Sequence, residues 1–213
     1  MKSMWITWKD QDDEIVWPIT IGKKIDIFYQ QALGWQLHVA DLIANGGYPL
    51  GGGAKVQRIQ HSGFAVLQIC LSYFETIGKY QAPADGNHKK DNEYFKAGAQ
   101  TVFPCIQNAP SEVRKKLLEV LWKDARCGLY HSSRTRRGVG LSQPPNGEAM
   151  AYYPDAQVLV ISPERLPHAL KCHLERYRTD LLDPINVDAR QCFERQFDKD
   201  LGVNQQPAQQ NSV

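Results

Sequence analysis

The sequence predicts a mainly α-helical protein with a small β-hairpin or sheet appendage. Apolar residues recur every three or four positions over most of the chain, while short apolar runs separated by turn residues are confined to about residues 138–161. A length of 213 residues fits one domain, which we place at residues 1–201. The polar, glutamine-rich remainder at 202–213 is expected to be a disordered tail.

The N-terminal part predicts a hairpin over residues 4–20 and then a helix over residues 23–45. Two short extended pieces flank an acidic turn in the hairpin, and Pro18 favours an edge position there. The glycine-rich stretch 46–53 then ends the helix. It lacks the Gly-Lys-Ser/Thr ending of a phosphate-binding loop, so we expect a flexible connection.

Residues 55–80 predict the central helix, because the chain is apolar on most faces between Phe64 and Phe74. The polar residues of this segment fall at offsets of seven, four, three and four, which keeps them on one side of a helix. This polar seam consists of His61, Gln68, Ser72, Glu75 and Lys79.

The second half of the chain alternates between helical patterns and short strands. A helix that starts at a Ser111 cap should end near Tyr130 or His131. Further helices are expected over residues 92–102, 163–182 and 186–201, and strands over residues 139–141, 149–153 and 158–161.

Composition excludes several classes of protein. The net charge is only +2, so attraction to nucleic acid would have to come from a local patch. The five cysteines are widely spaced, which indicates neither a disulfide framework nor a zinc knuckle and suits reduced thiols in a cytoplasm. We see no secretory signal and no membrane span, and we expect no metal and no cofactor.

One segment carries a local excess of positive charge. Residues 125–147 contain Arg126, Arg134, Arg136 and Arg137, and no acidic residue. Arginine suits phosphate because its planar fork donates two hydrogen bonds at once. The segment therefore predicts an anion-binding surface in which Arg134, Arg136 and Arg137 gather an RNA backbone. The alternative is a solvated basic loop.

His131 adds acid–base chemistry to this segment. Histidine can move a proton near neutral pH, and a fixed cation such as Arg126 can stabilise the charge that develops on a phosphorane. Both functions are needed for RNA cleavage without a metal. The alternative is a histidine at a helix end that interacts with the last carbonyl groups.

The spacing of the pair sets a constraint. Residues five apart on an ideal helix point about 140° from each other. Arg126 and His131 would converge only if the helix ends or tightens near His131, or if a second subunit supplies one side of the cleft. We therefore expect a two-fold homodimer.

Arg126-x4-His131 at the end of a helix resembles the HEPN superfamily, whose motif is Arg-x4-6-His. Many HEPN members are metal-independent endoribonucleases of toxin–antitoxin and phage-defence systems. The resemblance is best over residues 56–80 and 111–131. It implies an up-and-down helical bundle, Arg126 and His131 as the active pair, Glu75 as the partner that orients them, and RNA, an antitoxin or another protein as partners.

Three functional hypotheses follow. The first is a HEPN-like, metal-independent endoribonuclease that cleaves unpaired RNA. The second is a non-catalytic module of the same fold that holds RNA, a nucleotide or a protein. In the third, Arg126 is structural, buried against Glu75, and the protein is a dimerising scaffold. A Cys127 nucleophile ranks lower, because nothing in the sequence marks this residue as exposed. A metal bound by Cys172 and His173 also ranks lower, because adjacent helical residues point about 100° apart.

Overall fold

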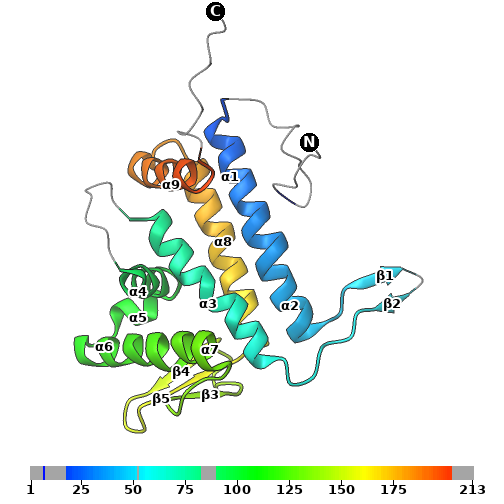
Figure 1. Cartoon of the computed structure of the whole chain (residues 1–213), viewed down its shortest axis with the longest axis vertical. Helices are drawn as coiled ribbons and strands as arrows, with labels where there is room; N and C mark the ends of the chain where they lie inside the picture. The colour runs from blue at the N-terminus through cyan, green and yellow to red at the C-terminus, as the bar shows by residue number, and fades with distance from the viewer. Residues whose placement is uncertain (1–6, 8–17, 52, 83–89, 203–213) are drawn as a thin grey trace, which may run out of the picture.

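The computed structural model describes residues 7, 18–51, 53–82 and 90–202. Figure 1 shows that most of this part of the chain is helical, with a small sheet at one end of the molecule. The predicted fold class, mainly α with a small sheet, is therefore confirmed. The hairpin expected over 4–20 and the tail expected over 202–213 fall almost wholly outside the described residues.

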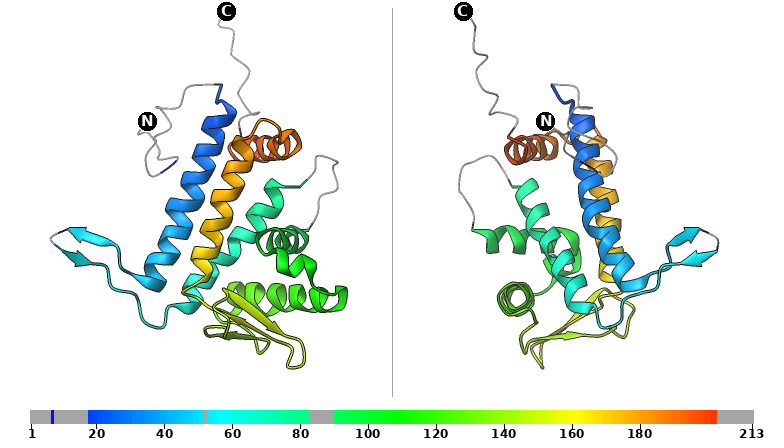
Figure 2. Two further views of the ribbon diagram at one scale, coloured as in Figure 1. Left: turned by 180° about the vertical axis from the view of Figure 1, so that it is seen from behind. Right: turned by 45° about the vertical axis from the view of Figure 1, so that its right-hand side comes forward.

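A long helical rod opens the described fold. It consists of α1 (Ile21–Gln30), a π-helical segment η2 (Gln31–Leu37) and α2 (His38–Asn45), which follow one another without a break. Thr20 caps the rod by accepting a hydrogen bond from the Lys23 amide at 3.3 Å. The rod lies beside α8 (Leu166–Leu182), as both views in Figure 2 show.

The last helix, α9 (Val187–Asp200), packs against the start of this rod. The amino group of Lys24 on α1 lies 3.1 Å from Glu194 and 2.7 Å from Asp198, both on α9. The Phe28 and Phe193 rings meet edge to face, with their centroids 5.5 Å apart. Residues from the two ends of the described chain therefore share one piece of core.

The central helix α3 (Gly63–Tyr80) starts later than the sequence predicts. Pro49–Gly51 and Ala54–Lys55 instead form a small antiparallel hairpin, β1 and β2. His61 has a φ of 59°, a left-handed conformation that ends any helix running through it. Ile59 and His61 are thus outside the helix, and the prediction of a single helix over residues 55–80 is wrong at its start.

α3 crosses α4 (Asp91–Val102) at very close range. A Cβ atom added to Gly78 would lie 1.9 Å from the Tyr94 carbonyl oxygen, and one added to Gly98 would lie 1.8 Å from the Phe74 carbonyl oxygen. Only glycine permits this approach of two helix backbones. α5 (Pro104–Asn108), a short helix that the sequence analysis does not anticipate, follows α4.

The helix predicted after residue 111 is continuous but irregular. It is made of α6 (Ser111–Val120), a π-helical segment η3 (Leu121–Arg126) and α7 (Cys127–Ser132). Pro110, and not Ser111, is the capping residue. Ser133, with a φ of 54°, ends the helix in a left-handed conformation.

The sheet contains β3 (Val139–Leu141), β4 (Met150–Tyr153) and β5 (Val158–Ile161) in the order β3-β5-β4. β5 pairs in parallel with β3, with Val139 opposite Leu159, and antiparallel with β4, with Ala151 opposite Val160. These strands match the predicted ones to within one residue. Figure 1 shows the sheet close to α6 and α7, so it lies near the predicted active pair.

A buried hydrogen bond joins α3 to α8 within the core. The Tyr73 hydroxyl lies 2.9 Å from Nδ1 of His173, and both side chains are buried. Burial lowers the pKa of His173 to about 4, so this imidazole is neutral at physiological pH. In the part of the chain that is described, no helix combines the length and apolar character needed to cross a membrane.

Candidate functional site

Arg126, at the end of η3, is held by an ion pair with the central helix. One of its guanidinium nitrogens lies 3.0 Å from Oε2 of Glu75, and the side chains are only 19% and 17% exposed. The other carboxylate oxygen of Glu75 lies 2.6 Å from the amino group of Lys79. Glu75 therefore fixes the position of Arg126 relative to α3.

Two aromatic rings hold the same guanidinium. Its carbon atom lies 4.9 Å from the centre of the Trp122 ring and 4.3 Å from the centre of the Tyr130 ring. We call Trp122, Arg126 and Tyr130 the Arg126 stack. Neither aromatic residue was predicted from the sequence to belong to the site, although their spacing of four on either side of Arg126 places them on its side of a helix.

His131 lies in a different environment. It is exposed at the end of α7, and within the described residues it makes no hydrogen bond with Arg126 or Glu75. α7 continues to Ser132, past His131, and residues five apart on a regular α-helix point about 140° from each other. The helix therefore does not end between Arg126 and His131, as the sequence analysis required for convergence within one chain.

The three other predicted arginines lie on the loop that follows α7, residues 133–138, which we call the arginine loop. Arg134, Arg136 and Arg137 are exposed, and no carboxylate of the described residues forms an ion pair with them. They line an open hollow of about 460 Å³ together with Ser132, Thr135 and Val139. The structure therefore brings these three residues together at one surface.

The arginine loop is fixed to the helix that precedes it. The Arg136 amide donates a hydrogen bond to the Asp124 carbonyl oxygen at 2.8 Å, and the Val139 amide donates to the Arg136 carbonyl oxygen at 3.1 Å. A Cβ atom on Gly128 would lie 2.7 Å from the Arg134 carbonyl oxygen, so only glycine lets the loop approach α7 this closely. The acceptor Asp124 belongs to the π-helical segment, a feature often found at functional sites.

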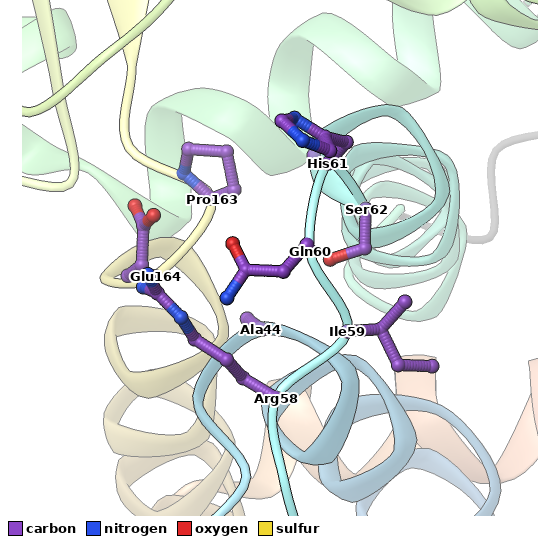
Figure 3. Close-up of a pocket in the computed structure, with 9 residues that line it drawn as sticks. Ala44, Arg58, Ile59, Gln60, His61, Ser62, Pro163 and Glu164 are labelled. Carbon is purple, nitrogen blue, oxygen red and sulfur yellow. The ribbon is translucent and has the colours of Figure 1, made fainter.

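A second polar hollow, of about 230 Å³, lies where α2 ends and α3 and α8 begin. Figure 3 shows Arg58 extending toward Glu164, with Gln60 pointing into the same space. The Glu164 carboxylate accepts a hydrogen bond from the Ser162 hydroxyl at 3.2 Å. This hollow mixes both signs of charge, so it is a weaker candidate for binding an anion than the arginine loop.

The lower-ranked hypothesis of a metal bound by Cys172 and His173 finds little support in the geometry. His173 is buried against Tyr73, whereas the neighbouring Cys172 is exposed, so the two residues face different environments. Across the described residues, no cluster of three or more His, Cys, Asp and Glu side chains is placed to hold a metal ion.

Comparisons with protein-family models, with curated proteins and with solved structures find no match for this chain. The resemblance to HEPN proteins therefore stays a prediction from the sequence.

Proposed function

We propose that this protein binds unpaired RNA through the arginine loop. One observation carries the proposal: Arg134, Arg136 and Arg137 line one hollow, are exposed and lack ion-pair partners within the described residues. Guanidinium groups without a carboxylate partner have all their N–H donors available for hydrogen bonds to phosphate. Unpaired RNA is the preferred form because its backbone and bases are accessible to protein side chains.

A titration of labelled single-stranded RNA at several salt concentrations tests this proposal. The Arg134/Arg136/Arg137 triple alanine variant should bind much more weakly than the wild-type protein. Removing three phosphate contacts should also reduce the slope of log K against log salt by about 2, since each contact to a single strand contributes about 0.7. Unchanged affinity and slope in the triple variant would remove the arginine loop as the binding surface.

A second candidate function is metal-independent RNA cleavage, with the same surface gathering the substrate. The observation that supports it is the 3.0 Å contact between Glu75 and Arg126, because the resemblance to HEPN proteins implies that Glu75 orients the arginine of the active pair. Residues five apart on a regular helix do not share a face, and α7 continues past His131. Cleavage therefore needs a homodimer in which His131 of one copy faces Arg126 of the other.

Complementation of two inactive variants tests this arrangement. Arg126→Gln and His131→Ala should each abolish cleavage of labelled RNA in the presence of a chelator. Mixing the two variants should restore activity, because a mixed dimer would contain one site with both residues intact. Cleavage by neither the wild-type protein nor the mixture, together with retained binding, would leave RNA binding as the function.

A further inference from the structure

We infer that Tyr130 is a stacking platform for a base of the bound strand, next to the phosphate-binding arginine loop. This inference rests on the proposed RNA binding and deepens it. Tyr130 is 42% exposed, although one face of its ring is covered by the Arg126 guanidinium at 4.3 Å.

The ring is held in place by a series of contacts that runs from the core to the surface. Phe74 and Phe95 are fully buried, and their ring centroids lie 5.5 Å apart. Phe95 contacts Trp122 at 5.2 Å, and the Trp122 ring covers Arg126 at 4.9 Å. Tyr130 ends this series. A ring fixed in this way loses little conformational freedom when a base stacks on it.

The charge behind Tyr130 also favours a base. Arg126 is a permanent cation whose position is set by Glu75 at 3.0 Å. A cation on one face withdraws electron density from the ring, so the opposite face attracts an electron-rich aromatic surface such as a purine. In the part of the chain that is described, no other aromatic ring packs against Tyr130.

The placement of Tyr130 suits a strand that also contacts the arginines. Tyr130 precedes by two residues Ser132, which lines the hollow of the arginine loop. Two residues of α-helix span only about 3 Å along the axis, but their side chains point about 160° apart around it. A base on Tyr130 and a phosphate in the hollow therefore belong to different nucleotides of one strand that passes around the C-terminal end of α7. Aromatic platforms beside basic grooves are the usual means of binding single strands without sequence preference.

The test compares two ligands of equal length and charge: an oligoadenylate RNA and a propanediol phosphate oligomer that has no bases. The wild-type protein should bind the RNA about tenfold more tightly or better, as expected for stacking of one base. Tyr130→Ala should remove this preference without weakening binding of the oligomer that lacks bases. Tyr130→Phe should keep the preference, because it keeps the ring.

Different binding results would overturn the stacking platform alone or RNA binding as well. Equal binding of both ligands by the wild-type protein, with binding lost in the Arg134/Arg136/Arg137 triple alanine variant, would overturn the stacking platform and leave RNA binding intact. Weaker binding of both ligands by Tyr130→Ala would show that the ring positions the arginine loop, and it would overturn the stacking platform. Thermal unfolding of Tyr130→Leu would check that α7 stays folded without the aromatic ring. Binding of neither ligand by the wild-type protein would overturn both proposals.

Discussion

The Glu75 carboxylate lies 3.0 Å from Arg126 and 2.6 Å from Lys79, so one acidic side chain joins the central helix to the π-helical segment. This contact makes Arg126 part of the fold as well as of the candidate site. Any loss of function in an Arg126 variant must therefore be separated from loss of stability. The stability of an Arg126 variant must therefore be measured alongside its function.

Arg126→Ala should lower the free energy of unfolding by about 2 kcal/mol, because it leaves a mostly buried carboxylate with one cation fewer. This loss in the free energy of unfolding is smaller than that for a buried charge with no partner, because Lys79 remains bound to Glu75. Urea denaturation measures the effect. Arg137→Ala, at an exposed arginine without an ion-pair partner in the described chain, is the control and should change stability by less than about 0.5 kcal/mol. Equal stabilities of the two variants would contradict a stabilising role for the ion pair.

The buried His173 should make stability depend on pH. Burial lowers its pKa in the folded protein to about 4 from the ordinary value of 6.5, so the unfolded chain takes up the proton first as the pH falls. The contribution of the neutral imidazole is thus fully present above about pH 6.5 and is lost as the pH falls toward 4. The difference in pKa corresponds to about 3 kcal/mol.

Urea denaturation of the wild-type protein and of His173→Gln between pH 7.5 and pH 4 checks this prediction. The glutamine variant lacks the titrating group, so the difference between the two curves isolates the histidine from the acid response of the carboxylates. A constant difference across this range would show that His173 is not the source of the pH dependence.

Gly98→Ala should destabilise the protein by about 3 kcal/mol, because its new methyl group would meet the Phe74 carbonyl oxygen at 1.8 Å and force α3 and α4 apart. Gly22→Ala is the matched control within a helix. A Cβ atom at Gly22 meets nothing within 4 Å, so the alanine should stabilise α1 by about 0.5 kcal/mol. Thermal unfolding distinguishes the opposite signs, and two changes of the same sign would argue against the close crossing.

Gly128→Ala should weaken binding of single-stranded RNA by about tenfold, or about 1.4 kcal/mol, because its methyl group would push the arginine loop away from α7. The clash is with the Arg134 carbonyl oxygen at 2.7 Å. Gly140→Ala, where an added Cβ meets nothing within 4 Å, should bind as the wild-type protein does. Equal affinities of the two variants would mean that the position of the loop does not govern binding.

The periodic parts of the fold were predictable from the sequence. Apolar spacing located the helices over residues 111–131 and 163–182 to within three residues at either end, and all three strands of the larger sheet. Apolar spacing gave the wrong helix boundary where local backbone geometry decides the structure. Ile59 continues the helical pattern of the central helix, yet it is 59% exposed, because the positive φ of His61 separates it from α3.

The candidate site was also predictable from the sequence only in part. The resemblance to HEPN proteins paired Glu75 with Arg126, and these residues are in contact. The arginine loop followed from charge alone. The stack of Arg126 on Trp122 and Tyr130 was missed because the sequence reasoning considered charge and acid–base groups and gave neither aromatic residue a role. The continuation of α7 to Ser132, past His131, depends on backbone hydrogen bonds that residue types do not specify.

The ion pairs from Lys24 to Glu194 and Asp198 have a consequence for how the chain is made. Lys24 is buried together with its α1 neighbours Ile25 and Phe28, and α9 supplies both of its acidic partners and part of its cover. During synthesis the N-terminal end emerges from the ribosome first. That helix keeps a cation and several apolar groups in water until its acidic partners, as far as 170 positions later for Glu194, have been translated.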